Sequence, residues 1–266
     1  MAGDPSAPGP DWARWLGPKL SRVRLNVIEP RLDPGRPPRI AKRRRRFSSW
    51  LIGPGNFYLR RLDARVRVLR DRPWHARERA VHRRLFGIEC EVDPRGWLLL
   101  PFWPGTVLVA YGADVRLPGD DRLRALAVAS RTLRDLHQIE LPLSDGVRGR
   151  FSHGDATLRN VIYDPASFRA HWFDFDTAHD PAEPARSRHA DDLRALLYSA
   201  LETLFDLPVP MILGTVRDAY DDPAVWDHLR SRLARTPLHW SPYHLAQASP
   251  PVGRCTDVER LLRGRE

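Results

Sequence analysis

Two stretches decide the fold: SHGDATLRNVIYD over residues 152–164, and HWFDFD over residues 171–176. The first places Asp155 and Asn160 in a loop that enters an apolar strand, and the second places Asp174 at the end of another apolar strand. A carboxylate near an acceptor hydroxyl can orient and deprotonate it, and an amide oxygen with a second carboxylate offers the hard oxygen ligands that Mg²⁺ needs beside ATP phosphates. The two stretches together therefore indicate phosphoryl transfer.

The spacing His-x-Asp-x-x-x-x-Asn, from His153 to Asn160, resembles the catalytic loop of the protein-kinase-like superfamily. Asp174-Phe175-Asp176 resembles the Asp-Phe-Gly metal motif of the same superfamily. A lone His-x-Asp triplet would be weak, so the conjunction carries the resemblance. The alternative is that Asp155 and Asn160 form turns, while Asp174 and Asp176 lie on the polar face of a strand. That alternative does not explain why all these residues lie at strand ends.

The resemblance extends over about residues 48–206. It is strongest to short bacterial kinases near the lipopolysaccharide-core heptose kinases, and weaker to aminoglycoside phosphotransferases and small atypical protein kinases. It implies an α+β, two-lobed protein-kinase-like fold, with a small antiparallel β-rich N-lobe and a mainly helical C-lobe. We expect a basic Pro/Arg-rich extension over residues 1–47, the N-lobe over residues 48–104, and the C-lobe over residues 105–266.

The resemblance also implies the cofactors ATP and Mg²⁺ and a role for each motif residue. These roles are the catalytic base for Asp155, magnesium ligands for Asn160 and Asp174, support of the loop for His153, and a brace beneath the loop for Asp192. Asp176 stands where the family has glycine, and is either a further metal contact or a strand-end residue. Asp192, with Asp191, could equally cap its helix, and the two roles are compatible.

The N-lobe carries the main departure from the family. Residues 64–70, ARVRVLR, resemble the strand whose pattern is Val-Ala-Ile-Lys, with Arg67 where the lysine belongs. Arginine keeps the charge but needs a different geometry, so either the site is adapted to arginine or it is impaired. The only lysines, Lys19 and Lys42, lie outside this region, so we expect no lysine to replace Arg67.

Glu78 is expected to orient Arg67 through a bidentate pair. It lies on a helix predicted over residues 73–86, and the alternative is a surface glutamate paired within its own helix. Before the Arg67 strand, residues 48–59 predict a β-hairpin that turns at Gly53-Pro54-Gly55-Asn56. Gly53 and Gly55 are weak candidates for a phosphate-covering loop, and an ordinary hairpin turn is the alternative.

Further along, residues 97–100 predict the last N-lobe strand, residues 121–137 a long amphipathic helix before the catalytic loop, and residues 190–204 a second one. Only a short segment separates Asp176 from that second helix, and Ala-Pro-Glu is absent, which argues against a conventional regulated protein kinase. Beyond Leu207 no function is assigned.

The chain has 266 residues, a formal charge of +10 and two cysteines, with no stretch of membrane-spanning length. We expect a cytoplasmic protein. Peripheral attachment to the inner face of the membrane is the further localisation to test. The run Lys42-Arg43-Arg44-Arg45-Arg46 is either a contact for anionic lipid or a solvated linker. Nucleic acid is not expected as a partner, because charge alone supports it.

The preferred hypothesis is an ATP-dependent phosphotransferase with a hydroxyl-bearing acceptor, such as a sugar, a lipopolysaccharide-type glycan or another small molecule. A catalytically impaired kinase-fold binding or scaffold protein is the first alternative, motivated by Arg67 together with the weak glycine loop and the basic run. An atypical Ser/Thr protein kinase is the second.

Overall fold

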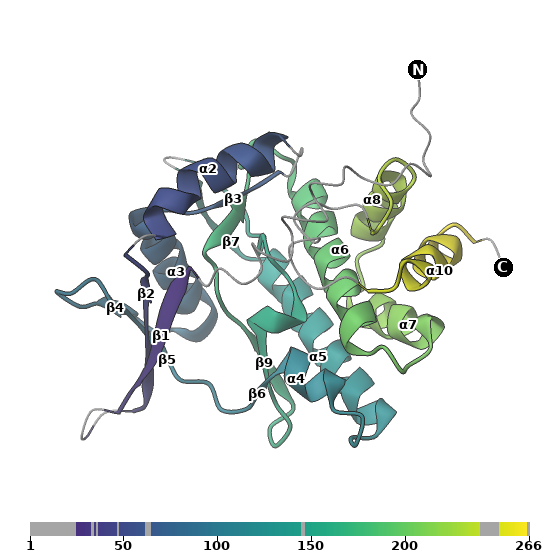
Figure 1. Ribbon diagram of the computed structural model, residues 1–266, viewed down its shortest axis with the longest axis horizontal. Helices are drawn as coiled ribbons and strands as arrows, with labels where there is room; N and C mark the ends of the chain where they lie inside the picture. The colour runs from purple at the N-terminus through teal and green to yellow at the C-terminus, as the bar shows by residue number, and fades with distance from the viewer. Residues whose placement is uncertain are drawn as a thin grey trace.

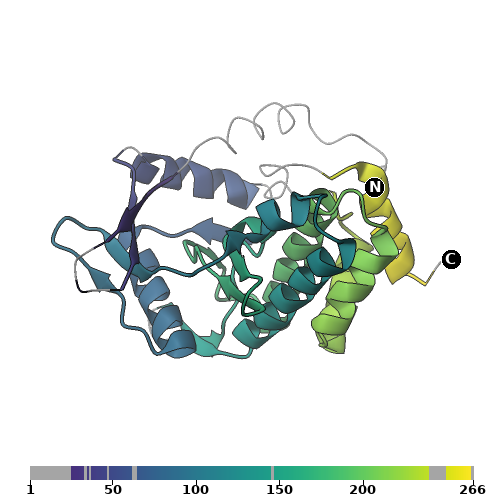
Figure 2. The ribbon, with the colours of Figure 1, turned by 90° about the horizontal axis from the view of Figure 1, so that it is seen from below.

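The computed structural model describes residues 25–32, 35, 37–46, 48–61, 65–144, 147–239 and 250–264. It has a small lobe built around an antiparallel sheet and a larger lobe dominated by helices (Figure 1). Figure 2 shows the same separation from below, with the early part of the chain on one side and the long helices on the other. The predicted α+β class and two-lobed arrangement are confirmed.

The small-lobe sheet has four antiparallel strands in the order β1-β2-β5-β4. Its strands are β1 (Asn26–Arg31), β2 (Arg39–Arg44), β4 (Glu91–Val92) and β5 (Leu98–Pro101). The predicted strand at residues 97–100 is thus confirmed as β5. The predicted extension over residues 1–47 is wrong for β1 and β2, and residues 1–24 lie outside the described part of the chain. Sequence patterning missed β2 because two of its inward-facing residues, Lys42 and Arg44, are basic, so no apolar alternation marks the strand.

Residues 48–61 form a helix, α2 (Ser48–Arg61), and the predicted hairpin with its glycine turn is wrong. One face of α2 packs on the lobe: Ile52 is buried, and Asn56 exchanges two hydrogen bonds with the backbone of Val68, with Nδ2 donating to the carbonyl at 2.9 Å and Oδ1 accepting at 2.8 Å. These positions are four residues apart, which is a helical period. Docking on this face outweighs the turn preference of Gly53, Pro54 and Gly55.

The next segment joins the two lobes. Strand β3 (Val66–Val68) pairs antiparallel with β11 (Thr177–His179), not with the four-stranded sheet. Helix α3 (Asp71–Phe86) follows and ends at Gly87, whose φ of 66° gives the left-handed cap that glycine adopts easily. The predicted helix over residues 73–86 is therefore confirmed, and its first turn lies directly after a strand that pairs with the exit of the metal motif.

The larger lobe is helical, with short strands around the loop that carries the candidate site. Its elements are β6 (Thr106–Val107), α4 (Leu108–Ala113), α5 (Gly119–His137), β7 (Glu140–Ser144), β8 (Val147–Arg150), β9 (Val161–Asp164), β10 (Arg169–Trp172), α6 (Ala185–Thr203), α7 (Val209–Ala219), α8 (Pro223–Leu233) and α10 (Val252–Leu262). The two long amphipathic helices predicted from the sequence are α5 and α6. The residues beyond Leu207, unassigned from the sequence, include α7, α8 and α10, which lie around α6 and α5 (Figure 1).

Each lobe has its own buried cluster. The large cluster is formed by helices α4, α5, α6, α7, α8 and α10 together with the strands around β9. The small cluster contains Leu69, Trp74, Cys90, Leu98, Leu100 and Ala178. Ala178 belongs to β11, so the segment after the metal motif is part of the small-lobe core. Among the described residues, none of the helices combines the length and apolarity needed to span a bilayer.

Candidate active site

The catalytic-loop segment runs from the end of β8 into a single 3₁₀ turn, Leu158–Asn160, and then into β9. Strands β9 and β10 pair antiparallel, with Val161 opposite Trp172. Just beyond that pair, the backbone N–H of Phe173 donates to the carbonyl of Asn160 at 3.0 Å. This register brings Asn160 next to the segment that carries Asp174, although the two residues are 14 positions apart in the sequence.

Asp192 on α6 holds the start of the loop. Its carboxylate accepts the backbone N–H of His153 at 2.6 Å and that of Gly154 at 2.8 Å, and it is buried. Burial alone would raise the pKa of Asp192, but the neighbouring histidines outweigh it and hold that pKa below its usual range. The contact implied by the resemblance is therefore present, and its effect on activity stays a prediction.

Gly154 is required where it stands. It has a φ of 88°, and a Cβ at this position would lie 2.8 Å from the backbone oxygen of Thr177. The loop therefore passes directly against β11, the strand that follows the metal motif. A side chain here would force the loop and the motif apart.

His153 is fully buried and supports the loop from within. Its Nδ1 accepts the backbone N–H of Asp155 at 3.2 Å, so in the neutral ring Nε2 carries the proton and donates to the carbonyl of Phe173 at 3.0 Å. Burial lowers the pKa of His153 to about 4, so the ring is neutral near pH 7. This placement matches the supporting role predicted for it.

Asp155 and Asn160 are in direct contact. The Nδ2 of Asn160 donates to Asp155 Oδ2 at 3.0 Å and to the Asp155 carbonyl at 2.8 Å. Both amide hydrogens of Asn160 are thus directed at Asp155, so its amide oxygen is the atom suited to a cation. Asp155 is partly exposed, as a group that meets a substrate hydroxyl must be.

The cation of the site is Lys42, and the prediction of Arg67 in this position is wrong. The Nζ of Lys42 lies 2.5 Å from Asp174 Oδ1 and 3.4 Å from Glu78 Oε1, and its side chain is only 4% exposed. Burial disfavours the charged ammonium, but the carboxylates of Asp174 and Glu78 outweigh it and raise the pKa of Lys42. Arg67 instead lies on β3, opposite Ala178.

The predicted pairing of Glu78 with Arg67 is wrong for the same reason, although Glu78 was correctly singled out. It is fully buried, and its Oε1 accepts hydrogen bonds from Lys42, from Nε1 of Trp74 at 3.1 Å, and from the backbone N–H of Phe175 at 3.1 Å. Glu78 therefore ties helix α3 to the lysine and to the metal motif together. The surface-glutamate alternative is excluded by this burial.

Sequence reasoning missed the site role of Lys42 because this lysine is the first residue of the basic run and was interpreted as part of it. Ile40-Ala41-Lys42 keeps the apolar residues and the lysine of the Val-Ala-Ile-Lys pattern, and it was the signal that could have found the strand. Helix α2 and strand β3 lie between this strand and α3, so Lys42 lies far upstream of Arg67, the position where the resemblance placed the lysine.

Asp174 has an unusual backbone. Its φ is 65°, in the left-handed region that non-glycine residues rarely adopt, and such positions cluster at ligand sites. Burial, together with the charge on Asp176, raises the pKa of Asp174 to about 7, while Lys42 opposes that rise. The surrounding residues therefore hold the Asp174 backbone in this conformation, and a nearby cation stabilises the charged form of its carboxylate.

The second aspartate of the motif is held by the small lobe. Asp176 Oδ2 accepts from Arg44 Nη1 at 2.9 Å and from Asn26 Nδ2 at 3.0 Å. Although burial opposes ionisation, Lys42 and Arg44 lower the pKa of Asp176. From the sequence, Arg44 was expected only as part of the basic run, and Asn26 was not singled out.

The donor set fits magnesium. Mg²⁺ in ATP sites is held by one or two carboxylates, phosphate oxygens and waters, and Asp174 with the oxygen of Asn160 supplies hard ligands of this kind. Within the described ranges, no group of three or more His, Cys, Asp or Glu side chains forms a separate candidate metal site.

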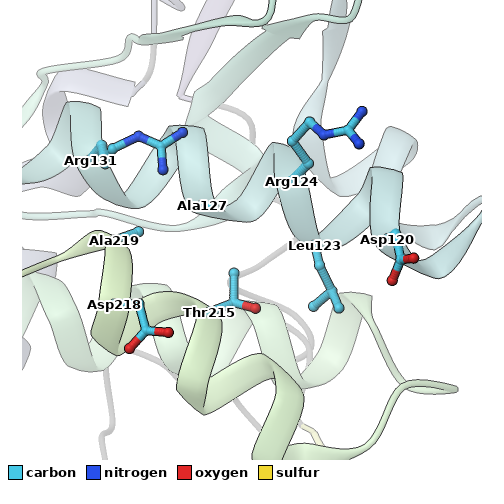
Figure 3. A pocket seen from close by; sticks show the side chains of 8 residues that line it. All are labelled: Asp120, Leu123, Arg124, Ala127, Arg131, Thr215, Asp218 and Ala219. Atoms are coloured by element: carbon cyan, nitrogen blue, oxygen red, sulfur yellow. The ribbon is translucent and has the colours of Figure 1, made fainter.

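Two predicted phosphate contacts are not part of this cluster. Gly53 and Gly55 lie on α2, exposed to solvent, so their predicted place in a phosphate-covering loop is wrong. A separate hollow of about 310 Å³ lies in the large lobe between α5 and α7 (Figure 3). It is lined by Asp120, Leu123, Arg124, Ala127, Arg131, Thr215, Asp218 and Ala219, and it includes none of the residues described above.

Comparison with solved structures finds similar folds, among them the following two. WaaP in complex with acyl carrier protein is 17% identical over 92% of this chain and 86% of that chain, with a TM-score of 0.44. An ethanolamine kinase of Plasmodium vivax is 10% identical over 90% of this chain and 84% of that chain, with a TM-score of 0.48. Because both TM-scores are below 0.5, the site assignments rest on this chain's own contacts.

No protein-family model matches the chain. No curated protein matches it either.

Proposed function

We propose that this protein is a Mg²⁺- and ATP-dependent phosphotransferase that acts on a hydroxyl group. The observation that carries the proposal is the buried contact of Lys42 with both Asp174 and Glu78, beside a loop that presents Asp155. A buried lysine–glutamate pair next to a metal-binding carboxylate is the arrangement that aligns nucleotide phosphates in kinases.

Each residue has a distinct task in this proposal. Lys42 binds the nucleotide phosphates, and Glu78 keeps its ammonium in place. Asn160 and Asp174 hold Mg²⁺, which when bound neutralises charge that develops on the phosphates. Asp155 orients the acceptor hydroxyl and takes its proton, while Asn160 fixes the Asp155 carboxylate. Asp192 and His153 fix the loop itself.

For the acceptor we propose a sugar, a lipopolysaccharide-type glycan or another small molecule. Strand β11 ends at His179 and α6 begins at Ala185, so only a short segment follows the metal motif. A protein kinase usually needs a longer segment there to position a peptide, which makes an atypical Ser/Thr protein kinase the less favoured candidate.

The scaffold alternative loses one of its motivations. It was based partly on arginine standing in place of the family's lysine, and a buried, paired ammonium, that of Lys42, supports a lysine in that position.

We also propose an anionic membrane surface as a partner, in a cytoplasmic protein that binds the inner leaflet peripherally. Of the basic run, Lys42 and Arg44 point into the site, whereas Arg43, Arg45 and Arg46 are exposed. With Arg44 and Val27 these arginines line a cavity of about 450 Å³. Arginines near a bilayer attract anionic headgroups by about 1 kcal/mol each.

The test is Mg²⁺-dependent ATP binding and slow ATP hydrolysis by the purified chain, with Asp155→Ala and Asp174→Ala beside it. We expect Asp155→Ala to bind nucleotide but lose turnover, because only the acceptor-activating carboxylate is removed. We expect Asp174→Ala to lose Mg²⁺-dependent binding. Asp257→Ala, an exposed aspartate of α10 paired with Arg260, is the matched control and should behave as wild type. Near-normal turnover of either site variant would overturn the assignment.

A further inference from the structure

Strand β2 faces the metal motif with two cations instead of one. Lys42 and Arg44 are two residues apart, so they point to the same side of the strand. Asp174 and Asp176 are likewise two residues apart, and the pairs match: Lys42 Nζ reaches Asp174 Oδ1 at 2.5 Å, and Arg44 Nη1 reaches Asp176 Oδ2 at 2.9 Å. The strand and the motif therefore meet through two parallel ion pairs.

The two ion pairs differ in how many further hydrogen bonds their members make to protein groups. Arg44 also donates Nη1 to Asn26 Oδ1 at 3.1 Å and Nη2 to the carbonyl of Leu69 at 2.9 Å, and its side chain is 3% exposed. The Asp176 carboxylate accepts further bonds from Asn26 Nδ2 at 3.0 Å and Thr177 Oγ1 at 3.2 Å. Both Asp176 oxygens are thus engaged by protein groups, whereas Asp174 is bonded to Lys42 through Oδ1.

The backbone is fixed at the same point. The N–H of Leu69 donates to the carbonyl of Asp176 at 2.7 Å, and Leu69 returns its own carbonyl to Arg44. Trp74 lies beside both cations, with its ring centroid 4.8 Å from Lys42 Nζ and 4.8 Å from Arg44 Cζ. The side chain and the main chain of Asp176 are therefore both bound to small-lobe residues that surround Glu78 and Lys42.

We infer that Arg44 is a positioning residue that anchors Asp176 to the small lobe, and that Asp176 serves as this anchor and is not a magnesium ligand. The inference deepens the proposed function and rests on it, since the anchor acts by holding Asp174 in its left-handed conformation for the metal. It settles the choice that the sequence left open for Asp176. It also assigns a structural role to Arg44, one of the two residues of the basic run that point inward.

The decisive variant is Arg44→Gln, because the two roles of Asp176 predict opposite effects. If Asp176 is an anchor, loss of Arg44 releases the motif, and the Mg²⁺ concentration for half-maximal nucleotide binding rises about tenfold, as for loss of other groups that orient metal ligands. If Asp176 is a ligand, Arg44 competes with the metal for it, and Arg44→Gln lowers that concentration or leaves it unchanged.

Asp176→Asn and the double variant complete the cycle. With an anchor, each single change leaves a buried charge without its partner, so Arg44→Gln with Asp176→Asn should bind Mg²⁺ and nucleotide better than the sum of the single losses implies. Arg39→Gln is the matched control: it lies on the same strand but pairs with Glu91 at 3.4 Å, and its Mg²⁺ dependence should equal wild type. Additive losses, or a Mg²⁺ requirement that falls in Arg44→Gln, would overturn the inference.

Thermal unfolding separates this inference from the proposed function. If the wild type binds no nucleotide, the phosphotransferase proposal fails. The melting temperatures of the wild type, Arg44→Gln, Asp176→Asn and the double variant still report the Arg44–Asp176 coupling, because this measurement needs no ligand. A double variant that melts at or above either single variant supports the anchor. Melting losses that simply add reject it.

Discussion

At the residue scale, burial decides which cation serves the site. Lys42 and Arg67 are both basic residues on short strands, but only Lys42 contacts Glu78 and Asp174. Arg67 lies on β3, whose partner is β11. The ammonium of Lys42 has lost nearly all contact with water, so its energy depends on the two carboxylates and on whatever anion enters the site.

The prediction at this scale compares Lys42→Met with Arg67→Met. Methionine keeps the length of the lysine side chain but removes the charge, so Lys42→Met should lower turnover about 100-fold, a loss typical of removing one group that stabilises developing charge. Arg67→Met should retain most of the activity. ATP hydrolysis rates of the two purified variants make the comparison, and a larger loss in Arg67→Met would restore the interpretation made from the sequence. Melting curves of both variants check that each is folded.

At the element scale, helix α2 has two unlike faces. One face packs on the small lobe: Ile52 is buried, and Asn56 bonds to the backbone of Val68 on β3. The opposite face carries Trp50, which is 84% exposed, and Phe57, which is 61% exposed. A helix with exposed aromatic residues and neighbouring arginines is suited to lie in the headgroup region of an anionic bilayer, where the rings enter the interface and the guanidinium groups meet phosphates. In Figure 1 this helix lies along the outer edge of the small lobe.

We therefore expect the protein to sediment with vesicles that contain anionic lipid and not with purely zwitterionic ones. Replacing Arg45 and Arg46 by glutamine should cost about 2 kcal/mol, or about 30-fold in vesicle affinity, and added salt should weaken binding of the wild type. Trp50→Ser with Phe57→Ser should weaken binding without changing ATP turnover in solution.

Phe205→Ser is the control for that experiment, since Phe205 is similarly exposed but belongs to the large lobe, after α6. Equal loss of binding in the control would show that the contact is not made by α2. Binding that is the same on zwitterionic vesicles, or sedimentation without vesicles, would reject the anionic bilayer as the occupant of this face.

At the scale of the whole molecule, a buried polar network links the loop to the helical lobe. His137 contacts Asp192 through Nε2 at 2.9 Å and the hydroxyl of Tyr220 through Nδ1 at 2.6 Å, and its ring stacks on His189 at a centroid distance of 4.1 Å. Burial lowers the pKa of His137, of His153 (to about 4) and of His189 (to about 3). The folded protein therefore holds three neutral histidines around one carboxylate.

This network predicts acid sensitivity of the fold. Histidine in the unfolded chain titrates near pH 6.5, so as the pH falls from about 6.5 toward 4 the unfolded chain takes up protons that the folded chain cannot. The contribution to stability is complete above about pH 6.5 and is lost below it. We expect the melting temperature to fall by roughly 5–10 °C between pH 7.5 and 5.

His189→Gln should make the pH dependence of the melting temperature shallower, because glutamine does not titrate but can still donate to the carbonyl of Phe151. His228→Gln, at a less buried histidine of α8, is the control and should change the slope less. A melting temperature that is constant from pH 7.5 to 5 would contradict this account.

Local chemistry determined much of this protein from its sequence alone. The residues from His153 to Asp176 form one continuous segment, so spacing was enough to predict the loop and its two apolar strands. The α+β two-lobed fold was implied by the family resemblance that this segment carries. Glu78, on a helix with clear start and stop signals, was also found. These features depend on neighbours in the chain, which a sequence displays directly.

The tertiary structure decided the rest. Lys42 and Arg44 became site residues only when β2 paired with β5 and turned its basic face toward the metal motif. The one sequence signal for this strand, Ile40-Ala41-Lys42, runs directly into four arginines, so no apolar alternation marks it. Residues 48–61 became a helix because this places Ile52 in a buried position and Asn56 in hydrogen-bonding contact with Val68 of β3. Both outcomes depend on contacts between distant segments, whose energies exceed the local preferences of glycine, proline and arginine.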